Sequence, residues 1–475
     1  MQLRKEIYTV EKIEEKISDI EIYKIFQGEP FSVILDSSLK NHKLGRYSII
    51  TFKPFMLFKS KGNNVELIKE EAIEKIYDDP LKCLKELLNK YKFDEYIPGI
   101  PFFSGCVGYF SYDLFRIIEK LHQNKKEDED VPDIMLGFYN SAVIIDHENE
   151  NVYVVATSIG LPDSGDLEQT VKQKLAEIKT LITKNREKIY KDEFIKKDIK
   201  RNTCDIISDF TKESYCETIK RAKEYIRNGD VYQVNLSQRF RTKINKKPFE
   251  VFEKLREISP VSFSAYINFE DIKIISSSPE RFIKIDNRII ETRPIKGTRP
   301  RGKNPDEDKK LKEELLNSEK DRAELIMIVD LERNDLGRVC KIGTVKVENL
   351  IELEEYSTVF HQVSTIKGEL KEDADVVDCI KAAFPGGSIT GAPKIRAMEI
   401  IDELEPVNRN IYTGSIGYIG FNGETDLNIA IRSIIVKKDE AVFNVGGGIV
   451  WDSVPQKEYQ ETLDKAKALI QALSD

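Results

Sequence analysis

YTGSIGYIGFNGETDLNIAIRSIIVKKDEAVFNVGGGIV, residues 412–450, runs directly into WDSVPQKEYQETLDKAKALIQAL, residues 451–473. In the first part, β-rich runs over 412–421, 426–436 and 441–445 are separated by short turn sequences, which predicts a meander of three antiparallel strands. In the second part, apolar residues recur at helical spacing from Pro455 to Leu473, which predicts a closing helix. The end of the chain therefore predicts an antiparallel sheet followed by a helix.

The preceding part of the second half has the same character. A helix is predicted over 212–228, because the helical pattern stops at Gly229, a residue type that commonly ends helices. Four strands and one long helix are predicted after it, over 262–268, 273–277, 281–285, 288–294 and 306–334. This order predicts an α+β fold with large antiparallel or mixed sheets covered by helices.

The first half has shorter elements. Strand-like pieces such as 32–35, 47–50 and 152–156 alternate with helical stretches rich in Lys and Glu. The charge-dense stretch 184–201 is the predicted linker. The sequence therefore predicts an N-terminal region over 1–200 and a C-terminal region over 205–475.

Composition limits the class of protein. The chain has 475 residues, 40% of them hydrophobic, and a net charge of −8, so it can bury a core and lacks the basic footprint of a nucleic-acid binder. Its six cysteines form no CxxC pair, which favours free thiols in a reducing compartment. The start has no signal-peptide core, and no apolar run reaches the ~18 residues of a membrane span. We expect a soluble, cytoplasmic protein.

Two helical segments carry paired carboxylates. Asp321 and Glu324 are three residues apart, as are Glu458 and Glu461, and residues at this spacing share one helix face. If the two helices face each other, their oxygens can converge on Mg²⁺, which prefers oxygen ligands. The alternative is a pair of solvated acidic helix faces.

Two glycine-rich loops and one lysine are also candidates. The loop over 385–394 exposes backbone N–H groups at the start of a helix, where an anion can bind, although an ordinary tight turn has the same composition. The run Gly446 to Gly448 allows close backbone approach to a ligand or forms a bulge. Lys296 follows a predicted strand and becomes a nucleophile only if burial lowers its pKa; otherwise it is a solvated loop residue.

Together these segments resemble the chorismate-binding enzymes. Six signatures in the family's order carry the resemblance, at residues 229–237, 276–280, 294–302, 323–335, 385–394 and 458–462. The N-terminal region resembles the corresponding region of the anthranilate- and aminodeoxychorismate-forming branches through Ile34-Leu35-Asp36-Ser37 and Ser111-Tyr112-Asp113. The resemblance implies large sheets packed face to face as a sandwich and flanked by helices.

The resemblance also implies roles for individual residues. Glu324 and Glu461 would hold Mg²⁺, with Asp321 and Glu458 in support. Glu280 would act as general acid for the departing hydroxyl, and His361 would position groups in the site. Substrate contacts would come from Gly297, Thr298, Ser388, Tyr412, Arg432, Gly446 and Gly448.

The branch within the family depends on few positions. Aminodeoxychorismate-forming members usually carry lysine where Lys296 stands, whereas anthranilate-forming members usually carry alanine. The resemblance implies that Lys296 attacks C2 of chorismate, after which ammonia, oriented by Asn235, adds at C4. Gln233 replaces the lysine that the water-adding members use, which argues against hydroxylation at C2. Anthranilate formation remains the alternative reaction.

Features outside the site suggest partners and a second ligand. Residues 260–266, Pro-Val-Ser-Phe-Ser-Ala-Tyr, lack the Pro-Tyr-Met of the tryptophan feedback pocket, while Asp36 and Ser37 retain part of it, so the resemblance implies that a bound tryptophan would be structural rather than regulatory. No glutaminase triad accompanies Cys106, which is interpreted as a core residue, so ammonia is expected from a separate glutaminase subunit. A non-catalytic chorismate- or tryptophan-binding subunit is the other alternative, although the metal carboxylates and Lys296 are retained.

Overall fold

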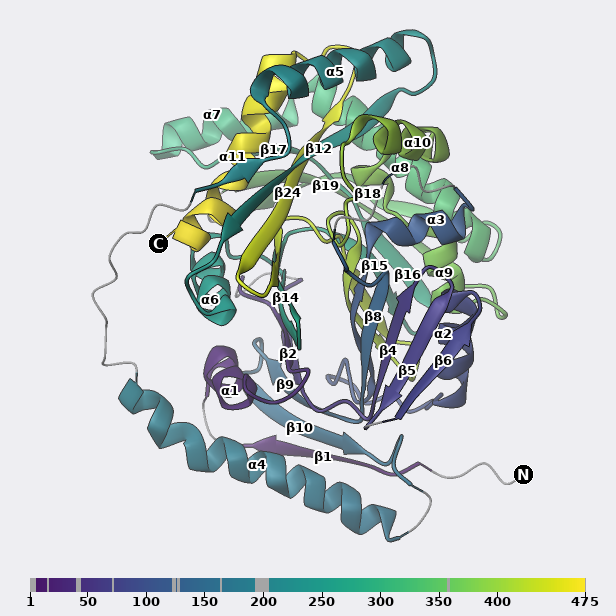
Figure 1. Ribbon diagram of the computed structural model, residues 1–475, viewed down its shortest axis with the longest axis vertical. Helices are drawn as coiled ribbons and strands as arrows, with labels where there is room; N and C mark the ends of the chain where they lie inside the picture. Colours follow the sequence, from purple (N-terminus) through teal and green to yellow (C-terminus); the bar gives the residue numbers. More distant parts are fainter. Residues whose placement is uncertain are drawn as a thin grey trace.

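The computed structural model describes residues 6–14, 17–39, 44–70, 72–121, 125, 129–162, 165–192, 205–356 and 359–474, with the backbone alone for 186–192. Two large sheets, whose strand pairs are all antiparallel, dominate this part of the chain. They face each other as a sandwich with helices on the outside (Figure 1). The predicted α+β class and sandwich are confirmed.

The first sheet runs across the molecule from an N-terminal edge to a C-terminal edge. In spatial order its strands are β1 (Tyr8–Ile13), β10 (Asn151–Thr157), β9 (Ser141–Asp146), β3 (Tyr47–Thr51), β2 (Val33–Asp36), β13 (Phe263–Phe269), β14 (Ile272–Ser278), β23 (Ser433–Lys437), β24 (Glu440–Ile449), β12 (Gln233–Lys243) and β11 (Ile207–Ser208), with β20 (Gly391–Ala392) against β12. The strands β12 and β24 carry two of the segments predicted to contact substrate.

The second sheet starts from a C-terminal edge instead. Its order is β17 (Ile295–Pro300), β19 (Val359–Glu369), β16 (Ile289–Arg293), β15 (Arg281–Asp286), β22 (Thr425–Asn428), β21 (Ser415–Gly420), β7 (Gly105–Phe110), β8 (Ile134–Tyr139), β4 (Met56–Lys61), β5 (Asn64–Lys69) and β6 (Ala72–Tyr77), with β18 (Lys346–Glu355) against β19. Lys296 lies on β17, the edge strand.

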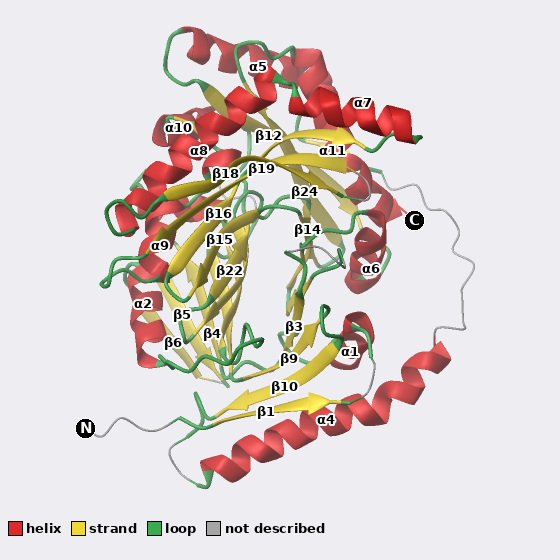
Figure 2. Cartoon of the chain, turned by 180° about the vertical axis from the view of Figure 1, so that it is seen from behind, coloured by secondary structure: helices red, strands yellow, loops and turns green. Residues whose placement is uncertain are grey.

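Helices cover the outer faces of both sheets (Figure 2). In chain order they are α1 (Asp19–Phe26), α2 (Pro80–Lys90), η1 (Tyr112–Leu114), α3 (Phe115–Ile118), α4 (Leu167–Asp192), α5 (Lys212–Arg227), α6 (Pro248–Ile258), α7 (Pro305–Leu316), α8 (Glu319–Val339), α9 (Val376–Ala383), η2 (Gly387–Ile389), α10 (Lys394–Leu404) and α11 (Pro455–Ser474). The helices α8 and α11 pack on β19 and β24 respectively, so both acidic pairs are fixed to the sheets.

Three large hydrophobic clusters among the described residues stabilise these layers, beside two smaller ones. One lies between the sheets and includes Val107 and Tyr109 of β7, while Cys106 and Phe110 of the same strand point outward into a second cluster beneath α2, α8 and α9. The third cluster lies under α1, α4, α6 and α11. Because both faces of β7 are covered, every residue of that strand is buried, Cys106 included, as predicted.

The two halves of the sequence are interleaved in space. Strand β2 pairs with β13 in the first sheet, and β7 pairs with β21 in the second, so each sheet contains a block of strands from both halves. The division into 1–200 and 205–475 remains a description of the sequence. The predicted linker begins within α4, and its part from 193 onward lies outside the described residues.

The predicted meander at the end of the chain is wrong in its middle strand. Residues 426–436 form two strands, β22 in the second sheet and β23 in the first. Between them the chain leaves the ladder: Ile429 N–H donates to the Glu280 carbonyl at 3.0 Å, and Arg432 adopts a positive φ of 50°. Uninterrupted β propensity cannot reveal which sheet a strand joins. The crossing brings Arg432 toward the candidate site.

The predicted single helix over 306–334 is also wrong, because it is two helices. Helix α7 ends at Leu316, and the Ser318 hydroxyl caps α8 by accepting the Asp321 N–H at 3.2 Å. A serine N-cap stabilises a new helix start by about 1 kcal/mol. Asp321 therefore lies in the first turn of α8 and Glu324 one turn later. The closing helix and the helix over 212–228 are confirmed as α11 and α5.

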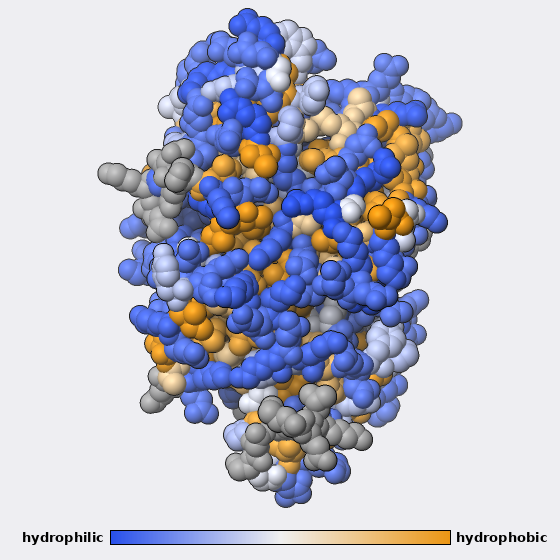
Figure 3. Space-filling model, turned by 90° about the vertical axis from the view of Figure 1, so that its right-hand side faces the viewer, coloured by the Kyte–Doolittle hydropathy of each residue, from blue (hydrophilic) through white to orange (hydrophobic). Residues whose placement is uncertain are grey.

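Among the described residues, none of the helices is both long and apolar enough to cross a bilayer. On the face drawn in Figure 3, hydrophilic residues separate small groups of apolar ones.

Candidate active site

Lys296 lies on β17, and its side chain reaches the glycine-rich loop over 385–394. Its Nζ donates a hydrogen bond to the Ser388 carbonyl at 2.9 Å, so the amine points into the protein even though the residue is only partly buried. Burial lowers the pKa of Lys296 below its ordinary value, against the opposing influence of Glu324 and Glu280. The structure thus places an amine with nucleophilic potential at this point, rather than a solvated loop lysine.

Glu280 lies beside this amine. It is 5% exposed, and its Oε1 accepts the Ile295 N–H at 3.3 Å, which ties the carboxyl to the start of β17. Burial raises the pKa of Glu280, while Ser388 and Lys296 act in the opposite direction. A raised pKa favours the protonated form that a general acid needs.

The two acidic pairs approach each other from different helices. A Cβ built on Gly447 would lie 3.5 Å from Glu461 Oε1 and 3.8 Å from Glu458 Oε2, which places both α11 carboxylates beside β24. Glu324 on α8 is close enough to Glu458 for their charges to interact. Burial raises the pKa of both Glu324 and Glu458, and like charges on neighbouring carboxylates raise it further.

Lysines neutralise part of this charge. Lys465 Nζ lies 2.8 Å from Glu461 Oε1, and Lys320 Nζ lies 3.8 Å from Glu324 Oε1. Burial alone would raise the pKa of Glu461, but Lys465 lowers it below its ordinary value. Lys465 also donates to the Gly446 carbonyl at 2.9 Å, so it joins α11 to the glycine run.

The donor set is compatible with Mg²⁺ in its chemistry. All four predicted groups are carboxylates, the hard oxygen donors that this ion prefers. Asp321 is adjacent to Gly297 and forms an ion pair with Arg299 at 3.1 Å. The four do not form a closed cage, because the only described trio of acidic, His or Cys ligand atoms lying within 4.8 Å of one another is formed elsewhere, by Asp19, Asp36 and His147.

Buried polar atoms without partners lie on the glycine-rich loop and on β12 beside the glycine run. Both amide atoms of Gln233, Oδ1 of Asn235 and Oγ of Ser388 make no hydrogen bond of good geometry within the described chain. Such atoms are costly unless a ligand or water satisfies them. A Cβ on Gly448 would lie 2.9 Å from Gln233 Nε2, so the glycine leaves room for this amide. The arrangement indicates a polar ligand.

His361 and Arg432 form the third side. Thr298 Oγ1 and His361 Nδ1 are 2.8 Å apart, and Gly297, with a φ of 76°, bends β17 beside them. Burial lowers the pKa of His361 to about 3, helped by the nearby charge of Arg432, so the imidazole is neutral. Arg432 has no salt bridge to any described side chain, and burial lowers its pKa, which makes it a cation available to an anionic ligand.

Tyr412 lies on a neighbouring loop held by an arginine that sequence reasoning missed. Arg409 forms a buried ion pair with Glu405 at 2.7 Å, and its guanidinium lies 5.8 Å from the Tyr412 ring centroid. It also donates to the carbonyls of Asn235 at 2.8 Å and Ile389 at 3.2 Å. Lys465 was likewise missed as a site residue, although its spacing of four from Glu461 is a helical ion-pair signal.

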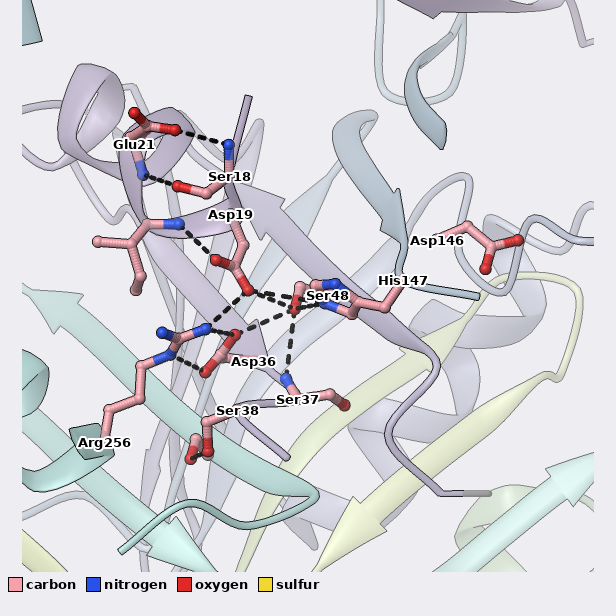
Figure 4. Close-up of polar contacts among 12 residues, drawn as sticks. Ser18, Asp19, Glu21, Asp36, Ser37, Ser38, Ser48, Asp146, His147 and Arg256 are labelled. Atoms are coloured by element: carbon pink, nitrogen blue, oxygen red, sulfur yellow. Dashed lines mark hydrogen bonds and ion pairs between the residues drawn. The ribbon is translucent and has the colours of Figure 1, made fainter. Parts of the chain in front are cut away.

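Asp36 and Ser37 lie apart from these residues. They line a cavity of about 370 Å³ between the sheets, together with residues that include Arg46, Tyr47 and Phe263. Figure 4 shows the carboxylates of Asp36 and Asp19 bound by Arg256, with Arg256 Nε 2.7 Å from Asp36 Oδ2. Burial and the Asp19 charge raise the pKa of Asp36 to about 7. The structure therefore contains two separate candidate ligand sites.

Comparisons with known proteins agree with this geometry. The family model described as chorismate binding enzyme matches residues 30–471. Anthranilate synthase component 1 of Acetivibrio thermocellus is 39% identical over 98% of this chain and 95% of its own length. Aminodeoxychorismate synthase component 1 of Escherichia coli K12 is 39% identical over 94% of this chain and 93% of its own.

A solved structure gives the same result for the fold. Anthranilate synthase component I from Streptococcus pneumoniae TIGR4 superimposes with a TM-score of 0.77 at 31% identity, and the match covers 96% of this chain and 98% of that one. Relatives of both reaction types are equally similar in sequence, so similarity does not select one reaction. The chain belongs to the chorismate-binding enzyme family.

Proposed function

We propose that this enzyme aminates chorismate at C4 to give 4-amino-4-deoxychorismate, a precursor of 4-aminobenzoate and folate. One observation carries the proposal. The amine of Lys296 points into the site, 2.9 Å from the Ser388 carbonyl oxygen, and is near enough to Glu280 for their charges to interact. A buried amine with a lowered pKa is what covalent catalysis by lysine requires.

The substrate is oriented by its two carboxylates. The enolpyruvyl carboxylate binds Arg432, which has no counter-ion among the described side chains, and Tyr412. The ring carboxylate lies toward Gly446, Gly448 and the Ser388 hydroxyl, which makes no hydrogen bond of good geometry among the described residues. Gly297 and Thr298 contact the ring, and neutral His361 holds the Thr298 hydroxyl in place.

The covalent step uses Lys296 and Glu280 together. The neutral amine attacks C2, the ring double bonds shift, and the C4 hydroxyl leaves as water with the proton of Glu280. Ammonia then forms the bond to C4 and passes its surplus proton back to the Glu280 carboxylate, and the electrons return through the ring to release the neutral amine of Lys296 from C2. The net reaction is chorismate plus ammonia to aminodeoxychorismate plus water. Because Lys296 blocks C2, nitrogen enters para to the ring carboxylate.

Magnesium belongs to this proposal as a cofactor. Glu324 and Glu461 would hold the ion, with support from Glu458 and Asp321, since all four offer carboxylate oxygens and Glu324 is close enough to Glu458 for their charges to interact. When bound, Mg²⁺ neutralises the ring carboxylate and polarises the ring. The ion pairs of Lys465 and Lys320 must then loosen, which their partly exposed positions permit.

Ammonia is proposed to come from a separate glutaminase subunit. The cysteine beside the glycines of β7, Cys106, is fully buried with a strongly raised pKa, so it cannot serve as the thiolate of a glutaminase. The unpartnered amide atoms of Gln233 and Asn235 offer hydrogen bonds to an incoming amine. The enzyme and its partner are proposed to act in the cytoplasm.

Anthranilate formation is the second candidate, because a relative with that name is as similar as the aminodeoxychorismate relatives. In that reaction ammonia attacks C2 directly and Lys296 has no covalent role. The two functions therefore differ in the fate of one nitrogen atom.

The cavity at Asp36 and Ser37 is proposed to bind tryptophan as a structural ligand. Its volume of about 370 Å³ is in the range of small-molecule sites, and Tyr47 and Phe263 supply aromatic walls.

The experiment is a product assay with chorismate, ammonium chloride and Mg²⁺, comparing the wild type with Lys296→Ala. We expect the wild type to form aminodeoxychorismate, detected as 4-aminobenzoate after addition of a lyase. Lys296→Ala should lose C4 amination on the order of 10³-fold or more, or divert nitrogen to C2 as fluorescent anthranilate. Chelation of Mg²⁺ should abolish both products.

Lys273→Ala is the matched control, since Lys273 is another strand lysine whose pKa burial lowers, and its loss should leave activity unchanged. Mass spectrometry of the quenched wild type should find chorismate minus water on the peptide containing Lys296. Anthranilate from the wild type would establish the second candidate instead, and undiminished C4 amination by Lys296→Ala would refute the covalent route.

A further inference from the structure

The loop that carries Tyr412 is held by a segment from the other half of the chain. The Asn410 N–H donates to Asp113 Oδ2 at 2.8 Å. The Asn410 carbonyl accepts the Ser111 hydroxyl at 2.8 Å and the Tyr112 N–H at 2.7 Å. Both backbone polar groups of one loop residue are therefore satisfied by three consecutive residues some 300 positions earlier, all of them buried.

The loop needs such external support because its backbone is strained. Asn410 has a φ of 53° and Thr413 a φ of 61°. Asparagine tolerates the left-handed region, whereas a β-branched residue there is a genuine outlier. Each strained residue costs about 1–3 kcal/mol and persists only where its surroundings over-determine it. Tyr412 lies between these two residues, so its direction depends on contacts made by its neighbours.

The same segment also supports the arginine behind the site. The Tyr112 ring lies beneath the guanidinium of Arg409, 4.8 Å from ring centroid to Cζ. Arg409 in turn holds the carbonyls of Asn235 and Ile389, next to Ser388. A cation on an aromatic face is stabilised by up to about 2 kcal/mol when desolvated. Residues 111–113 thus contact both structures that shape this side of the site.

Asp113 can accept the Asn410 N–H whether its carboxyl group is ionised or protonated. Arg116 approaches its carboxylate at 3.9 Å but bonds more closely to Asp402, at 2.6 Å. Burial raises the pKa of Asp113 to about 6, and Asp133 and Lys61 are the other charges that influence it. An amide oxygen would accept the Asn410 N–H equally well.

We propose that Asp113, supplied by the N-terminal half, is a positioning residue of the substrate site, which fixes Tyr412 by holding the Asn410 backbone. The inference rests on the proposed role of Tyr412 with the enolpyruvyl carboxylate. That carboxylate takes no part in bond making. Its misalignment therefore weakens the binding of the substrate and of the transition state equally, so KM rises while kcat is retained.

The test compares Asp113→Ala with Asp113→Asn in the full chain. Asp113→Ala should raise the KM for chorismate about tenfold with kcat within about threefold, as expected for one lost buried hydrogen bond. Asp113→Asn should restore KM to within about threefold of the wild type. Amide hydrogen exchange in peptides covering 408–413 should be faster in the alanine variant and normal in the asparagine variant.

The control is Asp146→Ala, which removes another buried carboxylate that accepts a backbone N–H, that of Glu148 at 3.1 Å, in the β9–β10 turn. It should lower thermal stability without moving KM. If Asp113→Ala does not fold, Ser111→Ala removes one contact to the same residue and should raise KM about threefold.

The outcomes separate this inference from the proposed function. An unchanged KM in Asp113→Ala would overturn the positioning role, whether or not amide exchange in 408–413 is faster. A wild type that neither binds nor converts chorismate would overturn the proposed function itself, and this inference with it.

Discussion

Glu332 of α8 is a buried carboxyl that the proposed reaction does not use directly. It is 7% exposed, accepts the Thr292 hydroxyl at 2.8 Å and has no salt bridge to any described residue, because Lys394 pairs with Asp335 instead. Burial raises the pKa of Glu332 to about 8, with Glu280 and Asp335 adding to the effect. An ionised Glu332 would raise the pKa of Lys296. A neutral Glu332 therefore helps to keep the Lys296 amine uncharged.

This carboxyl should make stability fall as pH rises. The folded-state pKa of about 8 exceeds the ordinary 4.5, so between these values the folded protein holds a proton that the unfolded chain has lost. Between pH 6 and pH 8 the wild type should lose roughly 2 kcal/mol relative to Glu332→Gln. Chemical denaturation of both proteins at the two pH values measures this difference.

Glu319→Gln, an exposed change on the same helix, is the control and should follow the wild type. Parallel pH curves for the wild type and Glu332→Gln would mean that Glu332 is ionised when folded.

Sequence reasoning identified the candidate reactive residues more readily than the residues that support them. Lys296, Glu280 and the paired carboxylates stand in local motifs, so the sequence alone identifies them as candidates, although the four carboxylates do not meet in a closed cage among the described residues. The roles of Arg409 and Glu332 depend on neighbours that are tens to hundreds of positions away, such as Tyr112 and Thr292. No local pattern marks such contacts.

At the scale of elements, the glycine run of β24 lies close against the backbone of β12. A Cβ on Gly446 would collide with the carbonyl oxygen of Leu236 across the β12–β24 ladder. A Cβ on the adjacent Gly447 would meet the Glu461, Lys465 and Glu458 side chains at 3.5 to 3.8 Å, which is ordinary contact. Gly446 therefore avoids a clash with backbone, whereas Gly447 leaves only ordinary contact with side chains.

Alanine substitutions should separate these two glycines. Gly446→Ala should lower the free energy of unfolding by about 1–3 kcal/mol, the cost of overpacking against backbone that cannot move aside. Gly447→Ala is the matched control and should change stability by less than about 1 kcal/mol. Denaturant midpoints measure both, and equal values for the two variants would contradict the predicted clash.

Most elements could be predicted from periodicity, but their connections could not. The strands β13 to β16 and the helices α5 and α11 lie where alternation and helical spacing put them. The crossing at 429–432 was missed because the apolar residues Ile429, Ala430 and Ile431 continue the run between β22 and β23, and only tertiary pairing separates the two strands. The break at Asn317–Ser318 was missed because one capping hydroxyl decided it.

At the scale of the whole molecule, the cavity of about 370 Å³ lies between the sheets where both halves meet. Leu35 and Ile49 come from the N-terminal strands, and Ala265 and Asn428 come from the C-terminal ones. A ligand that fills it bridges all four and stabilises only the folded state.

L-tryptophan should therefore raise the melting temperature saturably. At a hundredfold excess over Kd the gain is about 2.7 kcal/mol, a shift of a few degrees for a chain of this size. L-alanine, which shares the zwitterion and lacks the indole, is the control ligand and should have no effect. Phe263→Ala, which removes an aromatic wall, should weaken the shift, and absence of any shift in the wild type would exclude a tryptophan site.

The interleaving of the halves also restricts how this chain can change through recombination. A crossover near residue 200 that imports the first half of a relative must fit two seams at once, Val33–Asp36 against β13 and Gly105–Phe110 against β21. At each seam, the two strands are joined by backbone hydrogen bonds and cover a buried hydrophobic layer. A mismatch at either seam therefore exposes core residues of both halves. Chimeras of such enzymes should survive only when the two strands of each seam, β2 with β13 and β7 with β21, come from the same parent.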